Sequence, residues 1–558
     1  MGVCKAEIPR KEIPTLQLSP AAQLPEGTNC LACSEDGRYL SMGHSQGLSV
    51  WCASSLVCVA EWLQDTLEIT FNQMTRMAET VYLLGTVDDM GVARIFAYQS
   101  ERVHLLSVIN PMENVNKRSI CLSFELSEGG DYGVASMSCN GDVWLEVYQL
   151  PTEIWMKQLE TVPLQKQDPS GEVDAEWSQF AVVLKIKPAG TTLHKHKDMK
   201  LTDFFTHCLS LDVETNSNCQ RRCTHHFLLP CGQSPDNDKT ELQPGLPVAV
   251  CVWWSGSYNL LQYSLHTFPK KKIDVEPMPD VVWPNSEEIL CSAASRCTRF
   301  VAVGLVGAMV CIWDRQSGYP LSVVSISAAD SAFSSVKFKD CWPESVEDLQ
   351  IFTAKVHFLV LCKSGAIFRI TTGRGTQSCV MQPIKRPVDS RDLPTVTTSV
   401  PFLQSLLLMV QRNGKMFLQD VTNQTTVCCL SLPLSHLITT PCKPVYALSA
   451  KQKTIFIQGD PDPSFSAPSE EGRQSQLFIF CFDESDITKK YTVSLPDSPQ
   501  QHSEACVNLE KSCNLYLKHR VLSVDERANA VTQKWKQLQE TAGTLLLQHS
   551  QMRKCSSL

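Results

Sequence analysis

The densest group of side chains that could do chemistry lies between Cys219 and His226. The run reads Cys219-Gln220-Arg221-Arg222-Cys223-Thr224-His225-His226, and thiolate sulfur and imidazole nitrogen are ligands that zinc prefers in proteins. A structural zinc site needs four ligands at usable spacings, and this run holds neither a Cys-x-x-Cys pair nor a His-x-x-x-His pair. We interpret it as part of a cysteine-rich insertion, with zinc binding as the less favoured alternative.

The other cysteines indicate buried thiols rather than disulfides or metal ligands. Cys30 and Cys33 have Cys-x-x-Cys spacing, but no second pair follows them nearby. Four more lie inside apolar runs, where cysteine acts as a small hydrophobe: Cys251, Cys291, Cys311 and Cys362. Because this chain of 558 residues and 25 cysteines begins without the apolar core of a signal peptide, we expect reduced, metal-free thiols and an intracellular protein.

The sequence contains no arrangement that is typical of an enzyme. Gly-x-Ser-x-Gly, a glycine-rich phosphate loop and a paired metal motif are all missing, so we predict no catalytic residue, no metal site and no cofactor. A net charge of −8 without a basic stripe argues against nucleic acid as a partner. No run approaches about 18 uninterrupted apolar residues, so we expect no transmembrane segment.

A repeated unit runs through most of the chain. Its clearest copy is Gly307-Ala308-Met309-Val310-Cys311-Ile312-Trp313-Asp314, a turn glycine, an apolar strand and the Trp-Asp pair of a WD repeat. Other copies contain the turn glycines Gly47, Gly91, Gly141, Gly365 and Gly414. Successive glycines lie 44 and 50 residues apart from Gly47 to Gly141, and 58 and 49 apart from Gly307 to Gly414. WD repeats run to about 40–45 residues, so the spacing indicates WD repeats with lengthened loops.

These repeats predict an all-β protein, a single degenerate WD-repeat-like β-propeller of seven to eight blades with a long loop insertion and a C-terminal helix. Leu16-Gln17-Leu18 is a candidate to close the ring by pairing with the last blade. Six residues are expected at structural blade positions, where the tryptophans hold neighbouring blades together: Trp51, Phe96, Trp144, Trp313, Asp314 and Phe368.

The predicted organisation has five parts. These are an N-terminal segment (1–28), blades one to three (29–159), an inserted irregular segment (160–245), the remaining blades (246–500) and a helical C-terminal tail (501–558). Within the insertion only Phe180–Lys187 has the pattern of a strand, which could belong to blade three. Loops of this length in a compact fold usually serve binding or are disordered.

The tail carries an apolar stripe at helical spacing. Val531, Trp535, Leu538 and Leu545 follow one another at intervals that place them on one face of a helix. The stripe could pack on the propeller itself, or it could bind a partner helix or groove. Both chain ends also resemble lipidation signals, at Gly2 and Cys555, but each departs from its motif: Ala6 replaces Ser or Thr, and polar residues follow Cys555.

Several longer runs resemble the WD repeat-containing protein 93 family. They are Val87–Arg94, Gly129–Tyr132, Gly141–Pro151, Trp313-Asp314 with Gly318–Leu321, and Lys443–Ala447, in the same order along the chain. The resemblance implies a non-catalytic scaffold of the axonemal central apparatus in motile cilia and flagella, present in the cytoplasm before assembly. Its partners would be axonemal scaffold proteins and microtubule-associated neighbours. The alternative is a cytoplasmic WD-repeat adaptor that recruits a peptide or protein partner through the propeller face.

Trp535→Ala distinguishes the two interpretations of the tail stripe. If the stripe binds a partner, the substitution should weaken incorporation into the larger assembly while the melting temperature of the purified protein stays almost unchanged. Unfolding of the variant, measured by circular dichroism, would assign the stripe to the propeller's own core instead.

Overall fold

The structure is a computed structural model that describes part of the chain. The described residues are 14–16, 18–111, 119–161, 177–188, 222–230, 246–265, 277–326, 332–339, 355–373, 377–403, 405–464, 474–482 and 487–491, with Gln533 and Lys536. By their internal contacts residues 1–493 and 494–558 form two units, and every strand with described bounds lies in the first.

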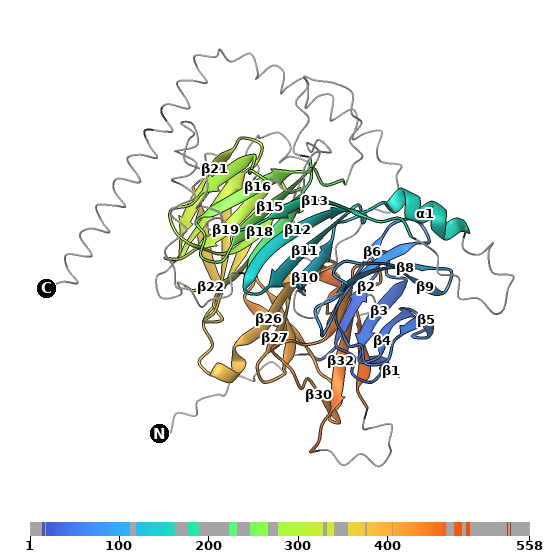
Figure 1. The fold of residues 1–558 in the computed structure, drawn as a ribbon. Coiled ribbons are helices and arrows are strands. Elements are labelled where there is room, and N and C mark those ends of the chain that lie inside the picture. The colour runs from blue at the N-terminus through green and yellow to red at the C-terminus, as the bar shows by residue number, and fades with distance from the viewer. Residues whose placement is uncertain are drawn as a thin grey trace, which may run out of the picture. The chain divides into compact units, whose positions relative to one another are not determined.

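The strands form eight antiparallel sheets that follow one another along the chain as the blades of a propeller (Figure 1). Blade one holds β2 (Cys30–Cys33), β3 (Tyr39–His44), β4 (Gly47–Cys52) and β5 (Cys58–Leu63). Blade two holds β6 (Ile69–Arg76), β7 (Tyr82–Asp88), β8 (Ala93–Gln99) and β9 (Arg102–Val108). Blade three holds β10 (Ile120–Leu126), β11 (Tyr132–Cys139), β12 (Asp142–Gln149) and β13 (Ala181–Ile186). Blade four holds β14 (Cys223–Leu228), β15 (Ala249–Trp254), β16 (Asn259–Ser264) and β17 (Val281–Pro284).

The second half of the ring has the same order. Blade five holds β18 (Ile289–Ala294), β19 (Phe300–Leu305), β20 (Met309–Asp314) and β21 (Tyr319–Ser325). Blade six holds β22 (Phe333–Phe338), β23 (Lys355–Cys362), β24 (Ile367–Gly373) and β25 (Cys379–Ile384). Blade seven holds β26 (Pro394–Ser399), β27 (Leu406–Gln411), β28 (Met416–Asp420) and β29 (Thr425–Leu430). The short 3-10 helix η5 (Ser390–Asp392) precedes β26, and η7 (Lys489–Tyr491) follows blade eight.

Blade eight closes the ring with a strand from the start of the chain. It contains β30 (His436–Leu437), β31 (Tyr446–Ser449), β32 (Thr454–Pro461) and β33 (Gln476–Cys481). Its outer strand is β1 (Leu18–Gln23), which pairs antiparallel with β33 from Leu18↔Phe480 to Gln23↔Gln476. The predicted closure by Leu16–Leu18 is confirmed at Leu18, whereas the N–H of Leu16 donates to the Cys429 carbonyl of blade seven (3.1 Å). The number of blades is eight.

The first strands of the blades lie innermost, next to one another around the axis of the ring. Because neighbouring strands in a blade are antiparallel, the turn between the second and third strands and the connection to the next blade lie at the same end of the sheet. We call the surface formed by these turns and connections the linker face. It is made of loops, which a rigid scaffold of strands holds in place.

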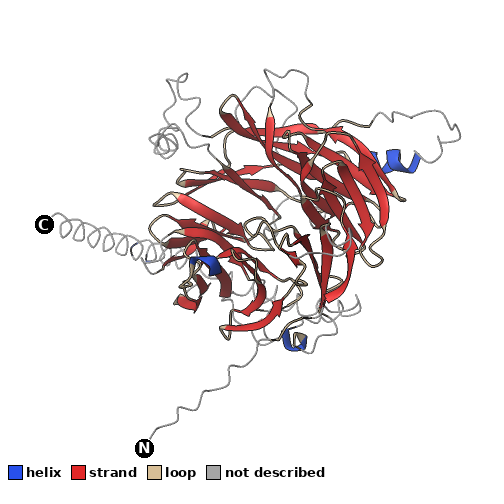
Figure 2. Ribbon diagram, turned by 90° about the horizontal axis from the view of Figure 1, so that it is seen from below, coloured by secondary structure: helices blue, strands red, loops and turns tan. Residues whose placement is uncertain are grey.

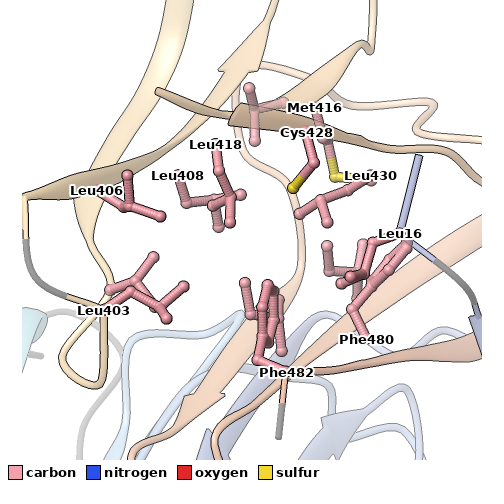
Figure 3. Packing of buried hydrophobic residues seen from close by; sticks show 14 of the residues in the cluster. Leu16, Leu403, Leu406, Leu408, Met416, Leu418, Cys428, Leu430, Phe480 and Phe482 are labelled. Carbon is pink, nitrogen blue, oxygen red and sulfur yellow. The ribbon is translucent and has the colours of Figure 1, made fainter. Parts of the chain in front are cut away.

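The apolar core is divided among the joints between blades. In the described part of the chain it forms eight clusters, and each takes its side chains from two neighbouring blades. Figure 3 shows the joint of blades seven and eight, where Leu408 and Leu418 face Phe480 and Phe482. Leu16, 5% exposed, lies in the same cluster and anchors the segment before β1. Both faces of an inner strand are thus buried, which explains the continuous apolar runs in the sequence.

Helix α1 (Thr152–Thr161) interrupts blade three between its third and fourth strands, at the edge of the strand-rich ring (Figure 2). Trp155 and Leu159 are 0% and 1% exposed and pack into the joint of blades two and three. The Trp155 indole donates a hydrogen bond to the Ser178 carbonyl (2.8 Å), which holds the helix to the chain that leads into β13. The sequence predicted helix only in the tail, because α1 is short and lies among strand signals.

The irregular insertion predicted over residues 160–245 needs correction at two places. β13 pairs with β12 and completes blade three, as the pattern of Phe180–Lys187 allowed. β14 pairs with β15 along its whole length, so the segment that contains His225 and His226 is the inner strand of blade four and not a loop. Its own pattern is too polar to reveal this, since the strand is defined by the buried partner β15.

The predicted turn glycines lie on the linker face between second and third strands, and all six have positive φ: Gly47, Gly91, Gly141, Gly307, Gly365 and Gly414. Two features require glycine at position 91. Its φ is positive (70°), and a Cβ there would collide with the Ile120 side chain of blade three. At Gly141 (φ 91°) a Cβ would meet nothing within 4 Å.

Gly91→Ala and Gly141→Ala form a matched pair. Alanine at a left-handed position costs about 1–2 kcal/mol, and we expect this loss for Gly141→Ala. For Gly91→Ala we expect about 1–3 kcal/mol more, because the joint of blades two and three must also shift. Urea denaturation measures both free energies of unfolding, and equal losses would show that the contact with Ile120 carries no weight.

Candidate protein-binding site

Polar side chains link the inner strands of blades three, four and five. Glu125 of β10 places Oε2 3.2 Å from Nε2 of His225 on β14. The next residue, His226, points to the other side of β14, where its Nε2 lies 2.7 Å from Oγ of Ser292 on β18. The Trp253 indole of β15 donates to the same Ser292 hydroxyl at 2.7 Å. One inner strand therefore connects both of its neighbours through side chains.

The electrostatics of this link depend on burial. Burial lowers the pKa of His226 to about 4, and the adjacent His225 adds to the effect. Partial burial opposes the charge of Glu125, whose side chain is 53% exposed, but the contact with His225 outweighs it and holds the pKa of this carboxyl below its usual range. At neutral pH His226 is therefore neutral, and its ring nitrogen shares a hydrogen bond with Ser292.

Other joints are crossed by other polar groups. The Gln73 amide of blade two donates to the Leu126 carbonyl (3.0 Å) and accepts from the Leu126 N–H (2.8 Å). Asn72 donates to the Ser41 carbonyl across the joint of blades one and two (3.1 Å). At the joint of blades five and six, Cys291 and Phe333 pack together in the core, and the hydroxyls of Ser322 and Ser378 lie 2.9 Å apart. The ring is thus fixed by several unlike contacts.

Trp313 and Asp314 lie where a WD repeat places them. Trp313 is 8% exposed, stacks on Trp283 of blade four at 6.4 Å between ring centroids, and donates to Asn285 at 3.1 Å. The Asp314 carboxylate accepts from the Gln316 N–H (3.2 Å) in the turn that follows, and it pairs with Arg299 at 3.2 Å. The tryptophan therefore joins two blades, and the aspartate orders the turn after β20.

The other expected blade positions differ in exposure. Phe96 is fully buried between blades one and two, and Phe368 is 4% exposed between blades five and six. Trp51 and Trp144 are only half-buried. The Trp144 indole donates to Glu146 (2.7 Å), and the Lys185 ammonium lies 4.6 Å from its ring centroid, so this residue connects the outer strands within blade three.

Sequence reasoning missed an equivalent of Asp314 in blade seven. Asp420 ends β28 and accepts from the N–H groups of Thr422 (2.7 Å) and Asn423 (3.1 Å) in the next turn. The Tyr491 hydroxyl of η7 also donates to Asp420 at 3.0 Å, so the carboxylate holds the chain after blade eight. The signal was present, because Asp420 follows the turn glycine Gly414 at nearly the spacing of Gly307 and Asp314.

The cysteine and histidine run does not converge. Cys219 lies outside the described residues, and His225 and His226 turn to opposite sides of β14 toward Glu125 and Ser292. Cys30 and Cys33 likewise diverge: Cys30 contacts the Ile69 carbonyl of blade two, and Cys33 lies beside Ser449 of blade eight. Across the described ranges, no three His, Cys, Asp or Glu side chains are placed to hold a metal ion. The four cysteines expected in apolar runs are buried.

Large apolar side chains are exposed at the linker-face ends of the inner strands of blades two and three and on the turn of blade two. Phe71 near the start of β6 is 41% exposed, and Met90 in the turn after β7 is 48% exposed. Ile120 and Leu122 of β10 are 44% and 45% exposed. The Cys121 N–H donates to the Gly91 carbonyl (2.8 Å), which brings the Met90 turn against this strand. We define these four residues as the apolar surface. Grouped exposed apolar side chains often mark interaction sites.

The stripe residues Val531, Trp535, Leu538 and Leu545 lie outside the described residues, as do both lipidation-like ends. In the described part of the chain, no helix has the length and hydropathy that a membrane crossing requires.

The chain is similar to one protein family and, at low identity, to several solved structures. The family model described as "WD repeat-containing protein 93" matches residues 28–211 and 191–310, just over half of the chain. Among solved structures, Saccharomyces cerevisiae Sqt1 is 10% identical with a TM-score of 0.46, covering 84% of this chain and 99% of its own. Chaetomium thermophilum Sqt1, bound to the N-terminus of ribosomal protein L10, is 13% identical with a TM-score of 0.46, covering 82% and 97%. The Cps50 (Swd1) β-propeller domain of Myceliophteria thermophila is 8% identical with a TM-score of 0.40, covering 84% and 100%. At this similarity the structures indicate nothing about partners of the present chain.

The link through His226 makes stability depend on pH. The folded pKa of about 4 lies below the ordinary value of 6.5, so the unfolded chain binds the proton more readily and stability falls as pH drops from about 6.5 to about 4. The free energy of unfolding of the wild type should fall between about pH 7 and pH 5. In His226→Gln we expect this fall to be smaller by about 2 kcal/mol. Asn72→Ala, which removes a side chain that does not titrate from the joint of blades one and two, is the control and should leave the loss as in the wild type. Urea titrations at both pH values decide, and an unchanged loss in His226→Gln would contradict the assignment.

Proposed function

The chain belongs to the WD repeat-containing protein 93 family, and on that basis we propose that it is a structural component of the central apparatus of motile cilia and flagella. In this role it would support axoneme assembly or motility through contacts with axonemal scaffold proteins and microtubule-associated neighbours. The WD-repeat propeller fold of the family supports the coarser statement that the protein is a non-catalytic, protein-binding scaffold.

The closed ring supports a scaffold role on physical grounds. Every blade is packed on both sides, and β1 supplies the outer strand of the last sheet, which ties the two ends of the ring together. Such a body presents its loops at fixed separations, which is what a part of a large ordered assembly needs. Binding then loses little conformational entropy in the scaffold itself.

The apolar surface of blades two and three is the observation that carries a protein-binding role. Phe71, Met90, Ile120 and Leu122 expose apolar area at rigid positions, on inner strands or on the turn packed against them. Burial of apolar area stabilises a complex by about 25 cal/mol per Å² before the costs of association. Four such side chains can form the centre of an interface, with the polar loops as its rim.

The second candidate is a cytoplasmic adaptor that recruits a peptide or protein partner through the propeller face. The position of the apolar surface at the inner strands favours it equally, since a peptide laid across the linker face would contact the same four residues. The tissue expression and the subcellular location of the protein distinguish the two candidate functions. A central-apparatus component should be expressed in ciliated and sperm-forming tissue and stay with detergent-extracted axonemes until salt is raised, whereas a broad soluble distribution in cells without motile cilia favours the adaptor.

Phe71→Ser with Leu122→Ser tests the apolar surface. Both side chains are exposed, so stability should change by less than about 1 kcal/mol, while retention in detergent-extracted axonemes should fall about tenfold. Val57→Ser with Leu63→Ser is the matched control, because both residues are 56% exposed on blade one and lie outside the apolar surface. Sedimentation with axonemes measures retention. Equal retention of the test and control variants would move the binding site elsewhere on the protein.

A further inference from the structure

Three loops of blades six and seven meet on the linker face, and all three carry exposed cations. The turn between β23 and β24 carries Lys363, the connection from β25 to β26 carries Lys385 and Arg386, and the turn between β27 and β28 carries Arg412 and Lys415. We call these five residues the basic surface. They come from segments that are separate in the sequence, so only the fold gathers them.

Hydrogen bonds and packing hold the three loops together. The N–H of Arg412 donates to the Leu393 carbonyl (3.0 Å), and the Asn413 amide donates to the Asp392 carboxylate (2.9 Å). On the other side, a Cβ on Gly365 would meet Leu393 Cδ2 at 3.0 Å and Pro387 Cδ at 2.9 Å, which shows that the first turn packs on the same connection. The cations are therefore carried on a fixed framework and not on independent loops.

The two carboxylates in this region, Asp389 and Asp392, already accept hydrogen bonds from neighbouring residues. Asp389 caps η5 by accepting from the Arg391 N–H (2.8 Å), and it binds the Arg391 guanidinium at 2.7 Å. Asp392 accepts from Asn413. In contrast, none of the five residues of the basic surface has an ion-pair partner within the described ranges. The surface thus presents five positive charges against the single carboxylate of Asp392, whose charge an amide does not neutralise, on a chain whose net charge is −8.

On blades one, two and five the linker face carries acidic side chains, whereas Lys187, Arg222 and Lys443 add exposed cations elsewhere on it. Glu26 lies before blade one, Asp65 lies between blades one and two, and Asp89 lies in the turn of blade two; all three are exposed. Glu287 and Glu288 lie between blades four and five. A ligand that covers the whole face would meet both signs, whereas a ligand confined to blades six and seven would meet mainly positive charge.

We propose that the basic surface binds a short acidic peptide segment of a partner protein. Lys363, Arg386, Arg412 and their neighbours match carboxylates spaced along an extended chain, and the two arginines offer planar forks for bidentate contacts. Val388, fully exposed between Arg386 and Asp389, adds an apolar contact beside the charges. A DNA duplex or an anionic bilayer is too extended to avoid the acidic sector of the same face, and the five residues include no aromatic ring for stacking on bases.

This surface is independent of the apolar surface and of the ciliary location. In a ring of eight blades, blades six and seven lie opposite blades two and three. The two surfaces can therefore hold two partners at once, or two parts of one partner.

The experiment measures fluorescence anisotropy of a labelled octaglutamate peptide with the purified full chain, and of an octalysine peptide as the reversed probe. We expect saturable binding of octaglutamate that weakens as salt is raised, and no comparable binding of octalysine. Arg386→Glu with Arg412→Glu should weaken octaglutamate binding about tenfold or more, since each reversal replaces attraction by repulsion. Arg102→Glu with Arg296→Glu makes the same charge change at exposed sites outside the linker face and should shift affinity less than about twofold.

Three outcomes would overturn the proposal. The first is unchanged octaglutamate affinity in Arg386→Glu with Arg412→Glu, and the second is an equal loss in the control pair. The third is tighter binding of a short DNA duplex, or of phosphatidylserine-containing vesicles, that depends on the same two arginines. If the charge-reversed protein melts at a lower temperature than the wild type, Arg386→Gln with Arg412→Gln takes its place and must still weaken binding. None of these results measures retention in axonemes. A failure of the peptide-binding proposal therefore leaves the proposed role in the central apparatus untouched.

Discussion

Face-to-face packing between blades is the contact on which this structure depends. In the described residues each apolar cluster draws its side chains from two neighbouring sheets, and no blade has a core of its own. A four-stranded sheet with two apolar faces is unstable in water unless both are covered. A row of such sheets meets this condition only when it closes, which is why β1 crosses to blade eight and Leu16 enters the joint of blades seven and eight. Closure is thus a consequence of how the blades bury their side chains.

Polar links refine this apolar packing. Apolar faces can slide past one another at little cost, but a buried hydrogen bond fixes the height at which two sheets meet, because a misplaced donor would be left without a partner. Gln73 binds both backbone groups of Leu126, and His226 and Trp253 share the Ser292 hydroxyl. Where Cys291 packs on Phe333, the core of the joint is apolar, and the hydroxyls of Ser322 and Ser378 form a hydrogen bond elsewhere in it. The joints between blades therefore differ in how far they depend on the shape of the apolar side chains and how far on hydrogen bonds.

A ring fixed in this way leaves chemical variation to the linker face. The inner strands and glycine turns hold Phe71, Met90, Ile120 and Leu122 at one sector, and three interlocked loops hold the basic surface at the opposite one. Neither surface needs a moving part, since the atoms that expose it are tied to buried strands. The family fold explains the platform, while the particular side chains on the face give this chain its own binding chemistry.

The sequence by itself determined the propeller. Turn glycines such as Gly91, apolar runs and the Trp313-Asp314 pair are local signals, because positive φ, strand burial and turn capping act within a few residues. Tertiary structure decided what depends on residues far apart in the chain. The strand identity of Cys223–Leu228 comes from its pairing with the buried β15, and the burial of α1 comes from the joint beside it. The number of blades comes from the pairing of β1 with β33, and the basic surface exists only because three separate loops meet at Leu393 and Asp392. Local patterns cannot carry such information, since the free energy that fixes these features is gained only when distant segments are in contact.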